Sequence, residues 1–246
     1  MIHPLIPFAI KGAIWYQGEA NASRAWQYRS LFPDLISTWR QTFAAAMQNP
    51  ALATMPFCAV QLAPFKSIHD QPMESELAEL REAQVLATQL PKVSLAITTD
   101  CGDELRIHPR RKEPVGARLA LAARGIAYNQ PIQWSSPFLH DYAIVGDKAF
   151  LRFDGIGGGL VSSNGPPTGF AVCGPDRRFV WASDVEILSD NTIRVSSPGI
   201  TNPIAVANGL TFRALGSVDL STLSMANLNG KTPTNLGAAS YKAPQP

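Results

Sequence analysis

The sequence predicts a mixed α/β protein in which a domain with a parallel sheet is followed by a β-sandwich-like domain. Between residues 9 and 128, apolar strand-like runs alternate three times with segments of helical spacing, which is the pattern of βα units. From residue 131 the pattern changes to short alternating segments separated by Gly, Pro, Asn and Asp, as in antiparallel sandwiches. We place the boundary within residues 128–131, which gives domains of residues 1–129 and 130–246.

The first unit begins with a buried strand over residues 9–16, AIKGAIWY. Its carboxyl end leads directly into a cluster of small and polar residues: Gln17, Gly18, Glu19 and Asn21. A helix is predicted over residues 24–46, with Ser23 as its N-cap. Because ligands bind at the carboxyl ends of strands in open α/β sheets, this cluster is a candidate site.

The next two units repeat this order. They comprise a strand at 56–62 (PFCAVQL), a helix at 74–90, a strand at 93–99 (VSLAITT), a loop at 100–112 and a helix at 113–128 with Pro114 in its first turn. In the helix at 74–90, four residues recur at helical spacing and are expected to lie along one face: Leu77, Leu80, Gln84 and Ala87. In the same helix, Arg81 and Glu82 are expected to form a surface or interhelix ion pair.

The second half predicts short strands at residues 149–153, 170–173, 192–196 and 203–207, with an irregular tail after Gly216. The glycine-rich run at 155–159 is expected to be a turn, because no helix follows it that could hold a phosphate. Trp134 and Trp181 could stack on sugars, but a core position is the favoured interpretation.

Composition excludes several classes of function. The net charge of +2, with its scattered Lys and Arg, provides no basic stripe for nucleic acid. No apolar run approaches a membrane span, and the start lacks the layout of a signal peptide, so a soluble protein without a membrane partner is expected. No metal or cofactor is implied, because neither the three widely spaced cysteines nor three of the four histidines have the spacing of metal ligands. These residues are Cys58, Cys101, Cys173, His3, His69 and His140.

A second polar cluster follows the third predicted strand. The segment DCGDELRIHPR at residues 100–110 places His108 on the same rim of the sheet as Gln17 and Asn21. A histidine, a side-chain amide donor and nearby carboxylates are the parts of an acyl-transfer site, which needs a general base and oxyanion donors. Structural roles are the alternatives to an acyl-transfer site. His108 could cap the following helix, the basic cluster at 110–112 could be a solvated entrance to that helix, and Glu19 could only support its own loop.

The motifs GAIWYQGEANA, LREAQ and IHPRRKEPVGARLAL resemble the sialate O-acetylesterases of the SGNH esterase superfamily. GIGGGLV and VSSPGITNPIAV resemble the C-terminal β region of that family, so the resemblance extends from residue 1 to about 207. It implies a partial SGNH-type three-layer α/β/α domain followed by the sandwich. It also implies ester hydrolysis by a serine nucleophile, with His108 as the catalytic histidine, Gln17 as an oxyanion donor, and Glu19, Asn21 and Gly18 supporting the loop.

The sequence departs from this family at two points. The nucleophile of the family lies in a GQSN-type motif upstream of the WYQGE strand, and no GQSN, GDS or GxSxG occurs in this chain. Leu105 occupies the position, three residues before His108, at which many SGNH enzymes have the aspartate of the triad. Asp103 is our candidate for that acid. Glu104, Asp100 and the backbone carbonyl of Arg106 remain alternatives.

We therefore expect an N-terminally truncated carbohydrate O-acetylesterase that is inactive alone. The strand at 9–16 would expose an apolar edge, at which a missing N-terminal segment could pair. The expected substrate is an acetylated sugar or glycan, and the resemblance implies a periplasmic or secreted location for the complete protein. The alternative is a noncatalytic glycan-binding or interaction module built on the β-rich half.

Overall fold

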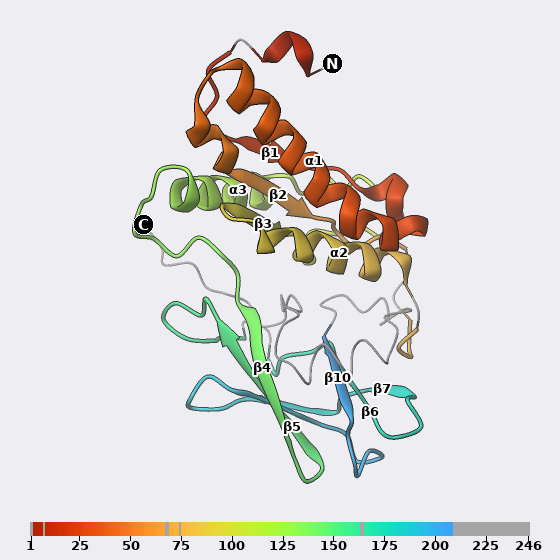
Figure 1. The fold of residues 1–246 in the computed structure, drawn as a ribbon. Coiled ribbons are helices and arrows are strands. Elements are labelled where there is room, and N and C mark those ends of the chain that lie inside the picture. The colour runs from red at the N-terminus through yellow and green to blue at the C-terminus, as the bar shows by residue number, and fades with distance from the viewer. Residues whose placement is uncertain (1, 7, 67–68, 74, 163–164, 209–246) are drawn as a thin grey trace.

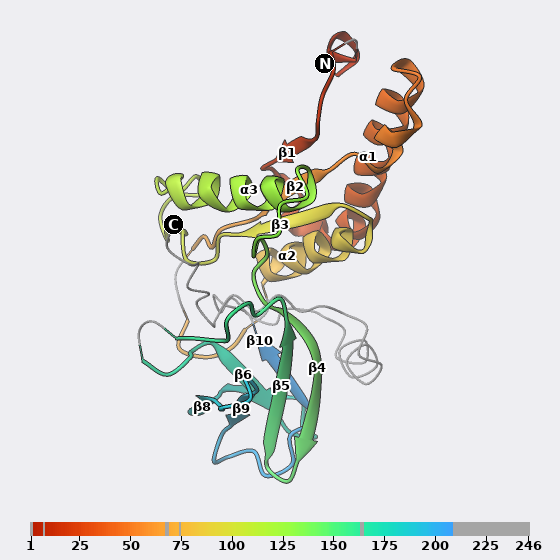
Figure 2. The ribbon, with the colours of Figure 1, turned by 90° about the vertical axis from the view of Figure 1, so that its left-hand side faces the viewer.

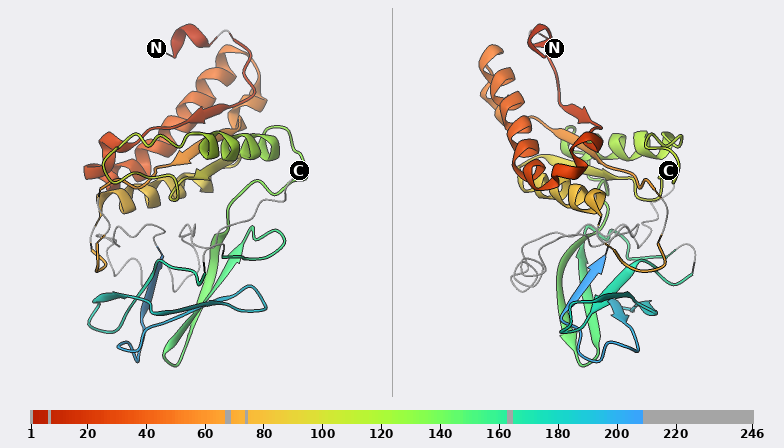
Figure 3. Two further views of the ribbon diagram at one scale, coloured as in Figure 1. Left: turned by 180° about the vertical axis from the view of Figure 1, so that it is seen from behind. Right: turned by 90° about the vertical axis from the view of Figure 1, so that its right-hand side faces the viewer.

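The computed structural model describes every residue except 1, 7, 67–68, 74, 163–164 and 209–246. A parallel sheet with helices forms one part of the molecule, and two antiparallel sheets form the other (Figure 1). Seen from behind and from the second side, the β-rich part lies below the helical part (Figure 3). The predicted order, a parallel α/β region followed by an antiparallel β region, is confirmed.

The parallel sheet contains β1 (Ala13–Trp15), β2 (Phe57–Gln61) and β3 (Val93–Ile97), hydrogen-bonded in that order. Every residue of β2 and β3 is buried, as their continuous apolar runs predicted. β1 is much shorter than the predicted run at 9–16. Its pairing with β2 starts only at Phe57, because Pro56 precedes β2 and has no N–H to extend the ladder.

Helices cover both faces of this sheet (Figure 2). α1 (Ala25–Ala46) and α2 (Glu76–Leu86) pack on one face, and α3 (Glu113–Ile126) packs on the other. The alternation of side chains along β2 explains this division, since Phe57 and Ala59 belong to the α1/α2 cluster while Val60 contacts the α3 side. The result is the three-layer α/β/α arrangement.

The remaining helical segments are short 3₁₀ turns. They are η1 (His3–Leu5), η2 (Glu19–Arg24), η3 (Pro50–Thr54) and η4 (Ala87–Gln89), the last of which extends α2. η2 runs directly into α1, whose N-cap position is Arg24 and has no side-chain cap. The prediction that Ser23 caps α1 is therefore wrong, because Ser23 is itself inside the preceding 3₁₀ turn.

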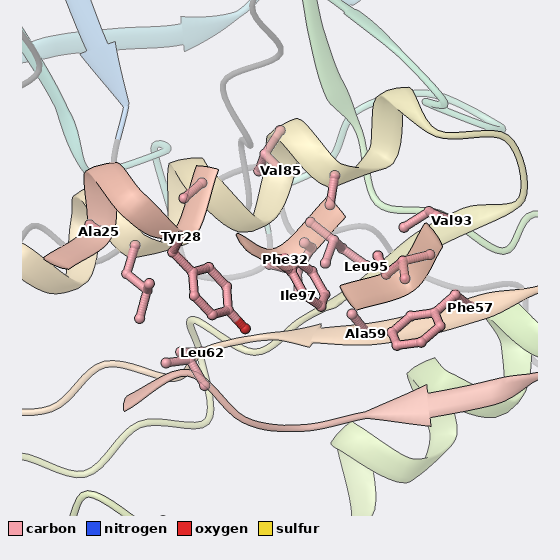
Figure 4. Close-up of a cluster of buried hydrophobic side chains, with 14 residues drawn as sticks. Ala25, Tyr28, Phe32, Phe57, Ala59, Leu62, Val85, Val93, Leu95 and Ile97 are labelled. Atoms are coloured by element: carbon pink, nitrogen blue, oxygen red, sulfur yellow. The ribbon is translucent and has the colours of Figure 1, made fainter. Parts of the chain in front are cut away.

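An aromatic cluster fastens the short edge strand to the rest of the core. Trp15 of β1 lies edge-on to Trp39, with ring centroids 5.6 Å apart, and within 6.4 Å of both Phe32 and Phe57. Tyr28 stacks on Phe32 at 5.2 Å. Figure 4 shows Tyr28, Phe32 and Phe57 within this buried cluster. Packing therefore holds β1 in place although its hydrogen-bonded ladder is only three residues long.

The β-rich part contains two antiparallel sheets with strand orders β4-β5-β9-β8 and β10-β6-β7. Their strands are β4 (Phe138–Val145), β5 (Lys148–Asp154), β6 (Phe170–Cys173), β7 (Phe179–Trp181), β8 (Asp184–Ile187), β9 (Ile193–Ser196) and β10 (Ala205–Asn208). Leu151 and Val195 of one sheet share a core with Phe170 and Val172 of the other, as in a sandwich. The predicted tail after Gly216 lies outside the described residues.

Candidate active site

The carboxyl ends of the three parallel strands lie at one edge of the sheet, which we call the rim. It is formed by residues 16–24, 62–66 and 98–112, which follow the three strands. The second and third loops run side by side, because Asp103 N donates to Pro64 O at 3.3 Å and Lys66 N donates to Glu104 O at 3.2 Å. Gly102 permits this approach, since a Cβ there would lie 2.5 Å from Pro64 O.

Gln17 and Gly18 turn the chain from β1 into η2. Gly18 is buried with φ of 149°, a conformation that a side chain would strain, and an added Cβ would contact Leu62 and Leu80 at 3.3 and 3.4 Å. Its carbonyl accepts a hydrogen bond from Asn21 N at 2.8 Å. This backbone bond closes the start of η2, and the supporting roles of Gly18 and Asn21 stay predictions. Glu19 lies in the first turn of η2.

The Gln17 carbonyl is held from two sides. Tyr28 donates to it from α1 at 3.4 Å, and Gln84 Nε2 donates from α2 at 3.5 Å. The sequence placed Gln84 only in the stripe of residues along one face of a helix, and its hydrogen bond to the Gln17 carbonyl was missed. The available signal was a polar residue within an otherwise apolar stripe, since buried polar groups normally have specific hydrogen-bond partners.

His108 lies exposed in the loop that follows β3. Within the described residues no hydrogen bond or ion pair fixes its imidazole. The proposed acid, Asp103, accepts a hydrogen bond from the Leu105 amide at 2.9 Å and so stabilises its own turn. Among the alternatives, Asp100 pairs with Arg118. The catalytic roles of His108, Gln17 and Asp103 therefore stay predictions, although all three residues follow strands that end at the rim.

Asp100 anchors the His108 loop to α3. Arg118 donates to both of its carboxylate oxygens, at 2.5 and 2.7 Å, and to Ile97 O at 2.5 Å. Burial alone would raise the pKa of Asp100, but the hydrogen bonds and charge of Arg118 lower it below its ordinary value of 3.8. In the neighbouring Cys101, burial and then the charge of Asp100 raise the thiol pKa, which keeps this thiol protonated at neutral pH.

Replacing Arg118 with methionine tests this anchor. Because the folded-state pKa of Asp100 is depressed, the stabilisation is present above pH 3.8 and lost as pH falls through the folded value. We expect a loss of about 1 kcal/mol of unfolding free energy at neutral pH, given the partial exposure of the pair, and a smaller loss in acid. Urea unfolding of both proteins from about pH 7 to about pH 3 measures the difference.

Arg124→Met is the matched control for this experiment. Arg124 lies in the same helix and donates to Gln130 Oε1 at 2.7 Å, an uncharged acceptor, so its effect is expected to be constant over this pH range. A pH-independent effect of Arg118→Met would mean that its bond to Ile97 O, and not its pairing with Asp100, accounts for the stabilisation.

Tyr16 and Lys112 join the two motif-bearing loops. Lys112 Nζ lies 4.5 Å from the centroid of the Tyr16 ring and donates to Tyr16 Oη at 3.4 Å. Burial, and then the charge of Glu19, raise the pKa of Tyr16, so the phenol remains neutral. Lys112 is four residues beyond His108, so this contact holds the base of the His108 loop beside the end of β1.

Other sequence expectations are resolved by the packing. Glu82 forms the interhelix pair with Arg29 at 3.3 Å, whereas Arg81 is only 6% exposed and donates from Nε to Leu77 O, so it is not a surface residue. Trp134 packs against Gly125, where an added Cβ would lie 2.1 Å from the ring. The run at 155–159 follows β5 as a turn, and Leu160 N is bound by Asn191 Oδ1 at 2.8 Å.

Two further features are absent from the part of the chain that the structure describes. No group of three or more His, Cys, Asp or Glu side chains there is placed to hold a metal ion. No helix there has both the length and the apolar character needed to cross a membrane.

Comparisons with known proteins identify similar sequences and a similar structure. No family model matches the chain. A sialate O-acetylesterase of Rattus norvegicus is 36% identical over 141 residues, which are 53% of this chain and 26% of the relative. A sialate O-acetylesterase of Pongo abelii is 30% identical over 193 residues, covering 74% of this chain and 36% of the relative.

The crystal structure of a carbohydrate acetylesterase from Xanthomonas citri has a similar fold. Its TM-score is 0.77 and its sequence identity is 36%, and the match covers 97% of this chain and 50% of that one. The chain thus spans about a quarter to a third of the two curated relatives and half of the chain of known structure.

Proposed function

Because this chain belongs to the sialate O-acetylesterase family and spans only part of its relatives, we propose that it forms one side of a carbohydrate O-acetylesterase site. The single observation that carries the proposal is the shared rim. The WYQGEAN loop and the IHPRRK loop leave adjacent ends of one parallel sheet and are joined by the contact between Tyr16 and Lys112. The substrate is an acetylated sugar or glycan.

In the proposed reaction a serine hydroxyl attacks the acetyl carbonyl, and His108 takes the hydroxyl proton. The side-chain amide of Gln17 donates to the oxygen that becomes negative in the tetrahedral intermediate. His108 then protonates the sugar oxygen as it leaves, and water hydrolyses the acetyl-serine by the same route. Asp103 is the proposed acid that orients His108, after a change in the turn that it now stabilises.

We propose that the attacking serine comes from a segment outside this sequence, since none of the serine motifs named above occurs within it. The open side of β1 is the proposed docking place for that segment. Among the residues that the structure describes, β1 pairs only with β2, and Ile14, at its centre, is 68% exposed. An additional strand there would complete the backbone hydrogen bonds of β1, and its side chains on the same face would pack beside Ile14.

The 246-residue chain is therefore expected to hydrolyse para-nitrophenyl acetate no faster than its own His108→Ala variant. Co-expression with the half of the Xanthomonas citri acetylesterase that has no counterpart here is expected to produce His108-dependent hydrolysis. Hydrolysis by the purified chain alone that is lost in His108→Ala would show that this sequence contains its own nucleophile and would overturn the proposal of a missing one.

We also propose a periplasmic or secreted location for the complete protein, which rests on the family resemblance alone. Fractionation of the native cells, followed by immunodetection of the chain, would test it. Recovery of the chain in the cytoplasmic fraction would contradict it.

A further inference from the structure

The side chain of Gln84 is fully buried at the rim, with 0% of its surface exposed. It projects from α2 between the ends of the first two strands. Its Oε1 accepts a hydrogen bond from Leu62 N at 3.0 Å, and its Nε2 donates to Val60 O at 3.2 Å and to Gln17 O at 3.5 Å. One amide therefore connects the loop after β1 to the loop after β2.

The chemistry of these partners specifies a carboxamide. Leu62 N can only donate, so it requires an acceptor, while the carbonyls of Val60 and Gln17 can only accept, so they require a donor. An ionised glutamate would satisfy Leu62 and repel both carbonyls. An apolar side chain would remove this partner from Leu62 N and Val60 O in a buried place, and would leave Gln17 O with Tyr28 alone.

The same amide lies against Gly18. A Cβ on Gly18 would be 3.5 Å from Gln84 Nε2, and the glycine has the positive φ that turns the chain out of β1. Fixing the Gln17 carbonyl and the Gly18 turn together fixes the direction in which the backbone carries the Gln17 side chain.

We propose that Gln84 is a positioning residue that holds the Gln17–Gly18 turn in the geometry needed for oxyanion stabilisation. This inference rests on the proposed function, in which Gln17 donates to the oxyanion. Gln84 does not touch the substrate in this account. It acts through the backbone of Gln17, in the way that supporting hydrogen bonds hold reacting groups within a fraction of an ångström of their working positions.

The first test uses the isolated chain and requires no activity. Gln84→Met keeps the length of the side chain and removes its hydrogen bonds, and the readout is hydrogen exchange at the Asn21 amide, which is bonded to Gly18 O. We expect exchange at least tenfold faster, beyond any change in global stability. Thr98→Val is the matched control, because it removes another buried rim bond, from Oγ1 to Gln61 O at 2.6 Å, that does not involve Gln17.

The second test uses the active assembly described above. Gln84→Met is expected to lower kcat about 10-fold to 100-fold with little change in KM, as expected when transition-state stabilisation alone is weakened. Gln84→Glu should recover part of kcat below the pKa of the introduced carboxyl, because the neutral acid can again donate to one carbonyl. Thr98→Val should leave kcat within about twofold, since its bond does not involve Gln17.

The outcomes separate the two proposals. Unchanged exchange at Asn21 in Gln84→Met, or equal exchange in Gln84→Met and Thr98→Val, would overturn the positioning role whether or not the assembly is active. An inactive wild-type assembly combined with faster exchange at Asn21 would instead count against the proposed esterase function and leave the structural link from Gln84 to Gln17 intact.

Discussion

In an assembly that hydrolyses acetyl esters, replacing His108 with alanine is expected to lower kcat by about 10⁶-fold, the scale seen when the histidine of a serine triad is removed. The reason is that a serine hydroxyl is a weak nucleophile until a base takes its proton, and the departing sugar oxygen needs that proton returned. Steady-state kinetics with para-nitrophenyl acetate and with an acetylated sugar measure the effect.

His140→Ala is the matched control. His140 is also exposed, but it lies on β4 of the sandwich, where Nδ1 contacts Asp154 Oδ2 at 2.9 Å. Its replacement is expected to leave kcat unchanged. Equal activity of the wild type and His108→Ala in a working assembly would remove His108 from the mechanism, whereas losses of equal size in both variants would indicate a general effect on folding.

Replacing Arg40 with methionine is expected to lower the free energy of unfolding by about 3 kcal/mol, the largest stability effect that we predict for a single polar side chain. Arg40 lies on α1 and is 3% exposed. It donates to Met55 O at 2.9 Å and to Pro91 O at 2.7 Å, with a longer bond to Lys92 O. These carbonyls precede β2 and β3, so this one guanidinium fixes the entry of both strands against α1.

Urea unfolding at neutral pH measures this loss, and Thr42→Ala in the same helix provides the comparison. Thr42 Oγ1 donates to Thr38 O within α1, where solvent can replace the bond, so an effect below about 0.5 kcal/mol is expected. A loss for Arg40→Met no larger than that for Thr42→Ala would show that water satisfies the exposed carbonyls and that the strand entries do not depend on Arg40.

The parallel layer could be predicted because its strands are simple. β2 and β3 are continuous apolar runs that are buried on both faces, and a helix of ordinary spacing follows each of them. β1 was predicted too long because the start of its ladder is set by Pro56, which lies just before β2. β4, β7 and β8 were not among the segments named from the sequence, and β4 carries His140 and Asp141 within its apolar pattern.

The location of the candidate site could be predicted from the sequence, but its side-chain contacts could not. Alternation of strands and helices brings the ends of β1 and β3 to one rim, so Gln17 and His108 could be assigned there from order alone. Spacing could not show that Asp103 accepts a bond from Leu105 N, because that bond depends on the Asp103 rotamer. It also could not show that Asp100 pairs with Arg118, which lies eighteen residues away in α3. The role of Gln84 was overlooked because its position fitted the pattern of residues that face the core from a helix.

The contact between Gly125 and Trp134 has a consequence for how the two halves are joined. Glycine inside a helix costs about 1 kcal/mol relative to alanine, so α3 would be a better helix without it. Any larger residue would collide with the indole, because an added Cβ would lie 2.1 Å from it. The packing of Trp134 against α3 thus depends on an absent methyl group. An alanine at this position would favour the helix and displace the indole that follows it in the chain.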